Sequence, residues 1–422
     1  MCIILLKTGN FKNIIRGVRS MKYELLKNLY YKDQTLYKTE FDKRYNNDFA
    51  FHLDIGINGN EAFFLRTPDL YEMVVKIVKT DSRLYDLYTH LPGVAIKQYI
   101  LKSLIGEIVG TNDIEHIHSS RSEINEILLT EKRAKNNRRF EDIVNRYLLL
   151  DKGNSLKSCD DIRKIYNDLL YDEIEAEDKS NLPDGEFFRR SQVNVHSATD
   201  KIIHKGVYPE SEIIKYMTKS LEFLNRDDVN ILFRIAIFHY LFGYIHPFYD
   251  GNGRISRFIS SALLFENLST DILAFRLSYT IKQNINEYYK AFKACNDPKN
   301  KGDLTPFIIM FFNIILKAMD NLETSLSGKK EKLYYYDEHM SKLPSVADKH
   351  MENIYFCLVQ ASLFSENGIS KEELMKGLKI SRGSLDNCFR KIPDNILIIK
   401  SVRRTKFYSL DLERFDEIIN ND

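Results

Sequence analysis

The chain has 422 residues, long enough for two or three domains of ordinary size. Apolar residues make up 44% and charged residues 28% of it, which is the balance of a soluble globular protein. Lys and Arg number 61 against 59 Asp and Glu, a net charge of +2, so no overall electrostatic bias indicates binding to nucleic acid or to a membrane. Any basic surface has to be local.

The cysteines and the N-terminal segment indicate the compartment. Five cysteines are scattered along the chain without metal-ligand spacing, which favours incidental thiols in a reducing compartment over disulfides or a zinc site. The apolar run 1–6 has no charged region before it and no small-residue cleavage site after it, unlike a signal peptide. We therefore expect a cytoplasmic protein, with residues 1–20 as an extension ahead of Met21.

Helical patterning dominates the first half of the chain. Residues 50–64 alternate in the manner of strands and contain Gly turns, which predicts a small hairpin. The acidic run 172–178, followed by Asn181, Pro183 and Gly185, is typical of a loop. Apolar residues recur at three- and four-residue spacing, which predicts helices, over 70–78, 93–109, 123–128, 140–150 and 159–170.

The second half begins with two short β-like stretches, 191–195 and 201–207, which predict another hairpin. The run 307–316 falls below the roughly 20 residues that span a bilayer, and Thr305 and Pro306 before it read as a helix cap and first position, which predicts a buried core helix. The polar stretch 325–332 reads as a linker. Helices are predicted over 210–224, 228–244, 255–265, 281–295 and 306–322.

The twelve residues from His246 to Arg257 carry the clearest chemistry. Gly251 and Gly253 let the backbone turn tightly and approach a ligand closely. The helix that begins near Arg254 then points its free amide groups and its positive end at that turn, which makes an anion-binding site. Arg254 and Arg257, three positions apart, share one helix face and suit phosphate oxygens.

Three more side chains complete this segment. Asp250 supplies a hard oxygen ligand of the kind that Mg²⁺ prefers, and polyphosphates usually carry Mg²⁺. His246 stands at the loop entrance, and its ordinary pKa suits a general base near neutral pH. Phe248, apolar among polar neighbours, is expected to anchor the loop in the core. A lone histidine or a single Gly-Asn-Gly is usually structural, but their co-occurrence with two arginines predicts a functional site.

The segment resembles the signature of the Fic (Fic/Doc) family, His-x-Phe-x-Asp/Glu-Gly-Asn-Gly-Arg-x-x-Arg, and matches every defined position. The resemblance covers residues 40–325 and implies a mainly α-helical bundle with a small β-hairpin flap. It also implies transfer of AMP from ATP to Ser, Thr or Tyr hydroxyls. In that reaction His246 would deprotonate the hydroxyl and Asp250 would hold Mg²⁺. Asn252 and the amides of Gly251 and Gly253 would bind the α-phosphate. Arg254 and Arg257 would contact the outer phosphates.

Two further segments of the sequence resemble features of the family. The hairpin around 202–209 resembles the flap that aligns the backbone of a target by strand pairing, and its alternative interpretation is an ordinary surface hairpin. Tyr288 and Tyr289 resemble a tyrosine pair found near the adenosine. Their alternative interpretation as core aromatic residues fits the pattern nearly as well.

The stretch from Thr111 to Glu115 matches the inhibitory pattern of the family, Ser/Thr-x-x-x-Glu-Gly/Asn, except that His116 replaces the final Gly or Asn. The resemblance implies that Glu115 pairs with Arg257, displaces the γ-phosphate and holds ATP unproductively. The alternative is a surface glutamate on a helix. In some members the same glutamate supports removal of AMP from targets, so reversal of the reaction is open.

The C-terminal quarter resembles a winged helix. Helices are expected over 353–365, 371–377 and 382–391, followed by strands over 397–400 and 406–410 around the tip Arg403-Arg404. Between positions 376 and 406 there are nine Lys or Arg and two Asp or Glu. This local excess of positive charge would attract DNA or another acidic partner. Protein contacts or dimerisation explain a winged helix equally well.

Together these patterns predict an AMP transferase restrained by Glu115, with ATP as substrate, Mg²⁺ as cofactor and a protein as target. The alternatives are a DNA-binding regulator with a nucleotide-sensing domain, an enzyme that removes AMP, and a transferase of another phosphate-containing group. No membrane partner is expected, and a homodimer stays open. The expected parts are an extension (1–20), an inhibitory helical region (21–130), a Fic catalytic domain (131–325), a linker or helix (326–352) and a winged helix (353–422).

Overall fold

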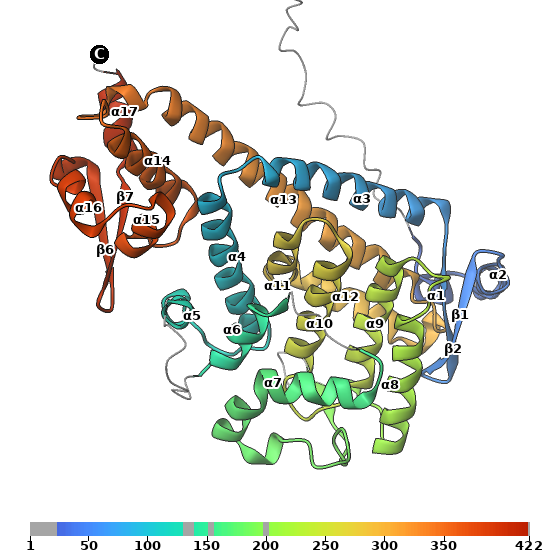
Figure 1. The fold of residues 1–422 in the computed structure, drawn as a ribbon. Helices are drawn as coiled ribbons and strands as arrows, with labels where there is room; N and C mark the ends of the chain where they lie inside the picture. The colour runs from blue at the N-terminus through green and yellow to red at the C-terminus, as the bar shows by residue number, and fades with distance from the viewer. Residues whose placement is uncertain (1–22, 130–138, 151–155, 197–201, 421–422) are drawn as a thin grey trace, which may run out of the picture.

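The computed structural model describes residues 23–129, 139–150, 156–196 and 202–420, and it is mainly helical, as predicted (Figure 1). The extension expected over 1–20 lies outside these residues. A bundle of helices surrounds α9 (Ile231–Ile245), and a smaller lobe, residues 349–420, stands at the far end of the long helix α13 (Thr305–Glu338). We call the second part the C-terminal lobe.

The N-terminal part of the bundle begins with α1 (Leu26–Lys32) and α2 (Gln34–Tyr45). The hairpin predicted over 50–64 is confirmed as β1 (Ala50–Ile57) and β2 (Asn60–Leu65), which pair antiparallel. Phe63 in β2 exchanges backbone hydrogen bonds of 2.8–3.0 Å with the segment just before α13, which fixes the hairpin to the bundle.

The next helices are α3 (Pro68–Thr89), α4 (Gly93–Ile114), α5 (Arg121–Leu128) and α6 (Glu141–Tyr147). In Figure 1, α3 runs beside α13, with which it packs. Helix α4 contacts both the bundle, through α11, and the C-terminal lobe, through α14. It is longer than the predicted helix over 93–109 and ends just before Glu115.

Helix α7 (Cys159–Glu177) is capped by Ser158, as predicted, and the side chain of Ser158 forms a capping box with Asp161. The prediction that 172–178 is a loop is wrong, because the helix continues to Glu177. Glu173 and Ile174 turn inward and are buried, while the other acidic side chains lie on the outer face. A helix needs only one buried stripe, so its outer face can be wholly acidic.

The centre of the bundle is α9, whose side chains are buried on nearly every side, as predicted. The helix predicted over 281–295 is broken at Asn284, where φ is −120° and ψ is 31°. Between α7 and α8, strands β3 (Asn194–His196) and β4 (Ile202–Lys205) form the second predicted hairpin. The surrounding helices are α8 (Glu210–Leu224), α10 (Asn252–Asn267), α11 (Leu277–Gln283) and α12 (Ile285–Cys295).

Helix α13 runs through 325–332, so the prediction of a linker there is wrong. Leu326 and Leu333 are buried on one face of this stretch, and its polar residues lie outward. Thr305 is the first helical residue instead of the cap, and its hydroxyl accepts a 3.0 Å hydrogen bond from the backbone of β2. Among the described residues α13 alone is long and apolar enough to cross a membrane, but 67% of its apolar window is buried inside the protein.

The C-terminal lobe carries three antiparallel strands in the order β5-β7-β6. Ser370 and Ser381 cap its second and third helices, as predicted. Its elements are α14 (Lys349–Phe364), β5 (Ile369–Ser370), α15 (Lys371–Leu378), α16 (Arg382–Phe389), β6 (Leu397–Val402), β7 (Thr405–Leu410) and α17 (Leu412–Asn420). The cysteines that the structure describes are unpaired and buried: Cys159, Cys295, Cys357 and Cys388.

Candidate functional site

The candidate site lies in the turn between α9 and α10. Helix α9 ends at His246, which has left-handed backbone angles (φ 53°, ψ 62°) and donates its amide hydrogen to the carbonyl of Phe242 at 3.0 Å. The ring of Phe248 is fully buried and stacks on Tyr166 at 4.2 Å between centroids. Phe248 therefore anchors this turn in the core, as predicted.

The imidazole of His246 is in the right protonation state for a base. Burial lowers the pKa of His246 to about 4, and the neighbouring His204 and Arg189 act in the same direction, whereas Glu115 acts against them. The ring is therefore neutral at neutral pH. A neutral imidazole can accept a proton from an attacking hydroxyl.

Sequence reasoning missed Arg189, which holds the turn at His246 in place. Its guanidinium is fully buried and donates to the carbonyls of His246 (2.9 Å), Ser191 (2.6 Å) and Val207 (2.8 Å). Burial lowers the pKa of Arg189 to about 10, so it stays charged at neutral pH. One buried cation thus ties both ends of the β3–β4 hairpin to the backbone of His246.

Gly206 allows the close approach of this hairpin. A β-carbon at position 206 would lie 2.5 Å from Nη2 of Arg189 and 3.2 Å from Cβ of His246, so a larger residue would push on both. The hairpin pairs Asn194 with Lys205. Its role as a flap that pairs with a target strand stays a prediction.

The first turn of α10 offers free backbone donors. Gly251 precedes the helix with φ 80°, and no side chain caps the helix at this position. The side-chain amide of Asn252 is engaged with the backbone of Phe248, donating to its carbonyl at 2.8 Å and accepting from its N–H at 2.9 Å. The Asn252 side chain therefore closes the loop through one of its two Nδ2 hydrogens, and its predicted contact with the α-phosphate stays a prediction. The backbone amides of the first turn, from Asn252 to Arg254, are also donors for a phosphate.

Arg254 is buried and only partly satisfied. Its Nη1 donates to Oε1 of Glu173 at 2.5 Å, and both side chains are almost fully buried. Nε and Nη2 of Arg254 have no hydrogen-bond partner among the described residues. Burial raises the pKa of Glu173 even though Arg254 acts to lower it. Unsatisfied donors on a buried cation are what phosphate oxygens would satisfy.

Asp250 fits the predicted role of a magnesium ligand. Its carboxylate is 40% exposed, accepts a 2.5 Å hydrogen bond from the amide of Gly251, and lies 4.0 Å from Nη2 of Arg254. Among the residues that the structure describes, no three His, Cys, Asp or Glu side chains form a metal-binding group. A single exposed carboxylate suits Mg²⁺, which keeps several waters and binds substrate phosphates as well.

Glu115 reaches the second arginine of the turn. Its Oε1 lies 2.7 Å from Nη2 of Arg257, and the hydroxyl of Thr111 accepts from Nε of Arg257 at 2.8 Å. A β-carbon at Gly253 would lie 1.9 Å from the same Oε1, so the carboxylate rests directly on the first turn of α10. Burial favours a raised pKa of Glu115, but Arg257 outweighs it and lowers that pKa, which keeps the carboxylate charged. We call the ion pair of Glu115 with Arg257 the inhibitory contact, after the sequence pattern that predicts it; its effect on activity stays a prediction.

His116 has a left-handed backbone with φ 59°. Its N–H donates to the carbonyl of Asp113 (3.2 Å), and the N–H of Ile117 donates to that of Asn112 (2.9 Å). This is the Schellman motif, whose left-handed position is usually Gly or sometimes Asn. The motif accounts for the Gly or Asn of the inhibitory pattern. Histidine tolerates this conformation better than most residues, so Glu115 is still presented to Arg257.

Residues 157–264, which span this whole turn, match the family model described as Fic/DOC family. The chain contains a Fic/DOC domain. It is 27% identical over 186 residues to protein adenylyltransferase Fic of Drosophila erecta, covering 40% of this chain and 34% of that protein. It is 30% identical over 140 residues to the protein of the same name from Drosophila grimshawi, covering 32% and 26%. The chain thus matches about a third or less of the length of these curated relatives.

A solved structure shows the same fold. The crystal structure of a Fic family protein from Desulfovibrio desulfuricans G20 aligns with a TM-score of 0.50 at 18% identity, covering 82% of this chain and 96% of that one. At this identity the likeness concerns the fold alone. It extends well beyond the Fic/DOC domain, into most of the chain.

The two tyrosines beyond the Fic/DOC turn have different environments. Tyr288 is buried, and its hydroxyl forms a 2.8 Å hydrogen bond with Nε2 of His239, whose Nδ1 contacts Ser260 at 2.7 Å. Tyr288 therefore packs as a core aromatic residue, and its role near an adenosine stays a prediction. Tyr289 is 46% exposed, and its role near an adenosine stays a prediction.

Proposed function

We propose that this protein transfers AMP from ATP to Ser, Thr or Tyr hydroxyls of target proteins and of itself. The observation that carries the proposal is the convergence on one turn of the neutral imidazole of His246, the uncapped start of α10, and two buried arginines, Arg254 and Arg257. The curated relatives named protein adenylyltransferase support the same reaction.

In the proposed reaction the hydroxyl oxygen attacks the α-phosphorus of ATP. The bond from that phosphorus to the oxygen bridging to the β-phosphate breaks, and pyrophosphate leaves. The hydroxyl proton passes to His246, while the amides of the first turn of α10 donate to the α-phosphate and the arginines contact the outer phosphates. Mg²⁺ held by Asp250 would neutralise charge on the polyphosphate. Positioning and electrostatic stabilisation supply most of such catalysis.

Glu115 restrains this reaction in our proposal. Its carboxylate occupies Arg257 and the space in front of Gly253, where the outer phosphates of productively bound ATP would lie. A charged carboxylate competes well with phosphate for one guanidinium. ATP then binds without the α-phosphate in line for attack, and the resting protein is slow.

The C-terminal lobe is, in our proposal, a winged helix, because its helices and its three-stranded sheet follow in the order of that fold. Two basic side chains of the local excess are already paired within the chain, Arg403 with Glu126 and Lys391 with Asp348. DNA binding by this lobe and a homodimer stay predictions.

The simplest test of the proposal asks which phosphate of ATP is transferred to the protein. Full-length protein carrying Glu115→Gly, so that restraint does not mask activity, is incubated with Mg²⁺ and ATP labelled on either the α- or the γ-phosphate. We expect protein-bound label from the α-phosphate alone, lost in a second variant with His246→Ala and kept with His90→Ala, an exposed histidine at the end of α3. Label from the γ-phosphate would indicate phosphotransfer and contradict the proposal. Loss of AMP from a modified protein, without labelling, would favour the reverse reaction.

A further inference from the structure

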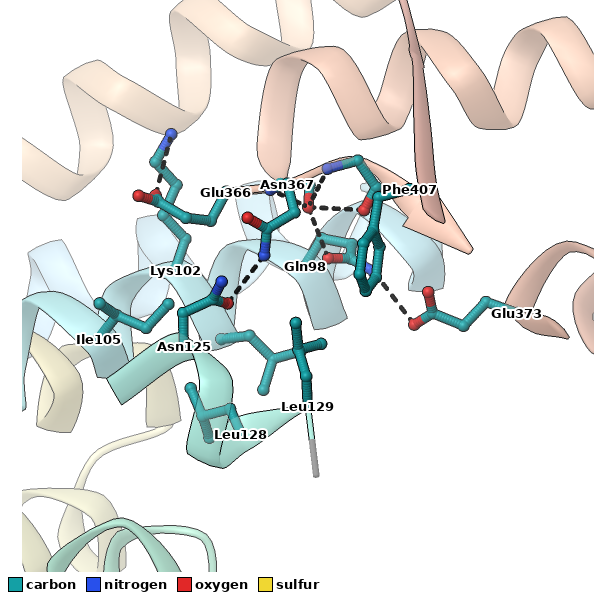
Figure 2. A pocket seen from close by; sticks show the side chains of 13 residues that line it. Gln98, Lys102, Ile105, Asn125, Leu128, Leu129, Glu366, Asn367, Glu373 and Phe407 are labelled. Atoms are coloured by element: carbon teal, nitrogen blue, oxygen red, sulfur yellow. Dashed lines mark hydrogen bonds and ion pairs between the residues drawn. The ribbon is translucent and has the colours of Figure 1, made fainter. Parts of the chain in front are cut away.

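The segment that carries Glu115 is held from its other side by the C-terminal lobe. Arg121, the first residue of α5, donates from Nε (3.0 Å) and Nη2 (2.9 Å) to the two carboxylate oxygens of Glu366, in the loop between α14 and β5. Lys102 of α4 lies 4.0 Å from the same carboxylate (Figure 2). One acidic residue of the lobe therefore bridges the two helices on either side of Glu115.

A buried layer lies beneath this ion pair. Nδ2 of Asn367 donates to Oδ1 of Asn125 at 2.8 Å, and the side chain of Gln98 contacts Ser365 at 2.9 Å and Glu373 at 3.3 Å (Figure 2). A cavity of about 30 Å³, room for a water, lies between these groups. Oδ1 of Asn367 has no hydrogen-bond partner among the described residues, which suits a bound water there.

The tip of the β6–β7 hairpin makes a third contact. Arg403, at the tip with φ 54°, donates from Nε (3.0 Å) and Nη2 (2.7 Å) to Glu126 of α5. The lobe thus contacts α5 at its first residue, at Asn125 and at Glu126. The side chains of these two ion pairs are between 24% and 43% exposed, so each pair contributes little to stability and breaks readily.

The turn between α4 and α5 is short and well fixed. Asn112 accepts from the amide of Ile117 through its carbonyl and donates from Nδ2 to the hydroxyl of Ser119 at 3.1 Å. Ser119 and Ser120 then lead directly into Arg121. Only residues 116–120 separate Glu115 from α5, so we expect a displacement of α5 to pull on the turn that presents the carboxylate to Arg257.

We propose that the C-terminal lobe is a regulatory domain that keeps the inhibitory contact closed through its contacts with α4 and α5. This rests on the proposed function, since the inhibitory contact restrains that reaction. When the contacts between the lobe and α5 break, the ion pair of Glu115 with Arg257 opens more often, and ATP binds productively. A partner that occupies the lobe at Glu366 or Arg403 would activate the enzyme.

A charge swap tests the proposal in the full chain. Arg121→Glu and Glu366→Arg are made singly and together, and the initial rate of automodification is measured with α-labelled ATP. We expect each single change to raise the rate about two- to fivefold, the scale of one exposed ion pair, and the double swap to return it towards wild type. With Glu115→Gly already present, none of the changes should raise the rate further.

The control is a matched ion pair remote from Glu115. Arg83 of α3 contacts Glu323 of α13 through Nε (2.9 Å) and Nη2 (3.2 Å), with similar exposure, and its swap should leave the rate unchanged. The proposal is overturned if Arg121→Glu leaves the rate at wild type while Glu115→Gly raises it. It is also overturned if Arg121→Glu raises the rate equally without Glu115, because the effect would then bypass the inhibitory contact.

A second measurement does not depend on activity. Backbone hydrogen exchange is compared in wild type, Arg121→Glu and the double swap over residues 111–121. We expect faster exchange in the single variant and recovery in the double swap, because the turn is ordered by the lobe. Unchanged exchange in the single variant overturns the proposal even if the chain transfers no AMP at all. Faster exchange in a chain that takes no label keeps the proposed coupling and rejects the proposed reaction.

Discussion

Oε1 of Glu115 accepts a 2.7 Å hydrogen bond from Nη2 of Arg257, although the two residues are 142 positions apart. The same oxygen rests on Gly253, where any side chain would collide with it. One carboxylate therefore both neutralises an arginine and fills the space in front of the first turn of α10. In the proposed reaction, ATP has to displace this carboxylate before its outer phosphates can reach Arg257.

The left-handed residue His116 sets how firmly Glu115 is presented. His116→Val should loosen the turn and raise automodification, because a β-branched residue is strained at φ 59°. His116→Gly should keep the rate low and stabilise the protein, since it relieves about 1–2 kcal/mol of left-handed strain, less the chain entropy that Gly adds. Automodification rates and thermal unfolding check both, with the exposed His118→Val as control. Equal rates for the Val and Gly variants would contradict this role of the turn.

The acid limit of activity should lie well below the ordinary pKa of histidine. Because burial lowers the pKa of His246 to about 4, the base stays unprotonated, and the single-turnover rate of the Glu115→Gly variant should be flat from pH 8 to about 5.5. Glu115 acts to raise that pKa, so its removal should not move the acid limb upward. Protonation also favours the unfolded chain between the unfolded pKa and the folded one, so stability falls as pH drops from about 6.5 towards 4. An acid limb centred near pH 6.5 would contradict a lowered pKa of His246.

Gly206→Ala should slow the chemical step. The new methyl group would press on Arg189 and on Cβ of His246, so kcat should fall at least tenfold while KM for ATP changes little. Gly328→Ala is the matched control, because nothing lies within 4 Å of that position on the exposed face of α13. It should leave the rate unchanged and stabilise the protein by about 0.5–1 kcal/mol. Wild-type kcat in Gly206→Ala would show that the hairpin does not position His246.

Glu173→Gln should destabilise the protein strongly. Removing one partner of a buried ion pair leaves the buried Arg254 with only the more distant carboxylate of Asp250, a loss of about 3–5 kcal/mol in the free energy of unfolding. Glu175→Gln, on the more exposed face of the same helix, should change it by less than about 0.5 kcal/mol. Denaturant unfolding with and without ATP measures both, and ATP should recover part of the loss by binding Arg254. Equal stability of the two variants would show that Glu173 does not compensate Arg254.

The chemistry of the site was readable in the sequence because most of it lies in one continuous stretch. His246, Asp250, Gly251 and Arg257 are close neighbours, and the inhibitory pattern at Glu115 is equally local. Arg189 and Glu173 were missed because each acts on a partner far along the chain, 57 and 81 positions away, and a single charged residue carries no signal of burial. The hydrogen bonds of the Asn252 side chain with the backbone of Phe248 were not predicted, because the sequence does not show which backbone groups a turn leaves unpaired.

The two polar runs that were misread have one physical origin. The acidic run 172–178 and the polar run 325–332 were read as loops because of their composition. Both continue helices, since Ile174 and Leu326 recur on buried stripes that packing stabilises. Tertiary burial of one face outweighs a polar majority, and it is visible only once the neighbouring helices are in place.

Automodification by wild type, Glu115→Gly and Glu115→Gly/His246→Ala, measured side by side with α-labelled ATP and Mg²⁺, tests the central claim most directly. Loss of a charge-assisted hydrogen bond of about 1.5–3 kcal/mol corresponds to a rise of roughly 10- to 150-fold in Glu115→Gly over wild type. The double variant should take no label while still binding ATP. Equal labelling of wild type and Glu115→Gly across a range of ATP concentrations, or labelling that persists without His246, would contradict the account.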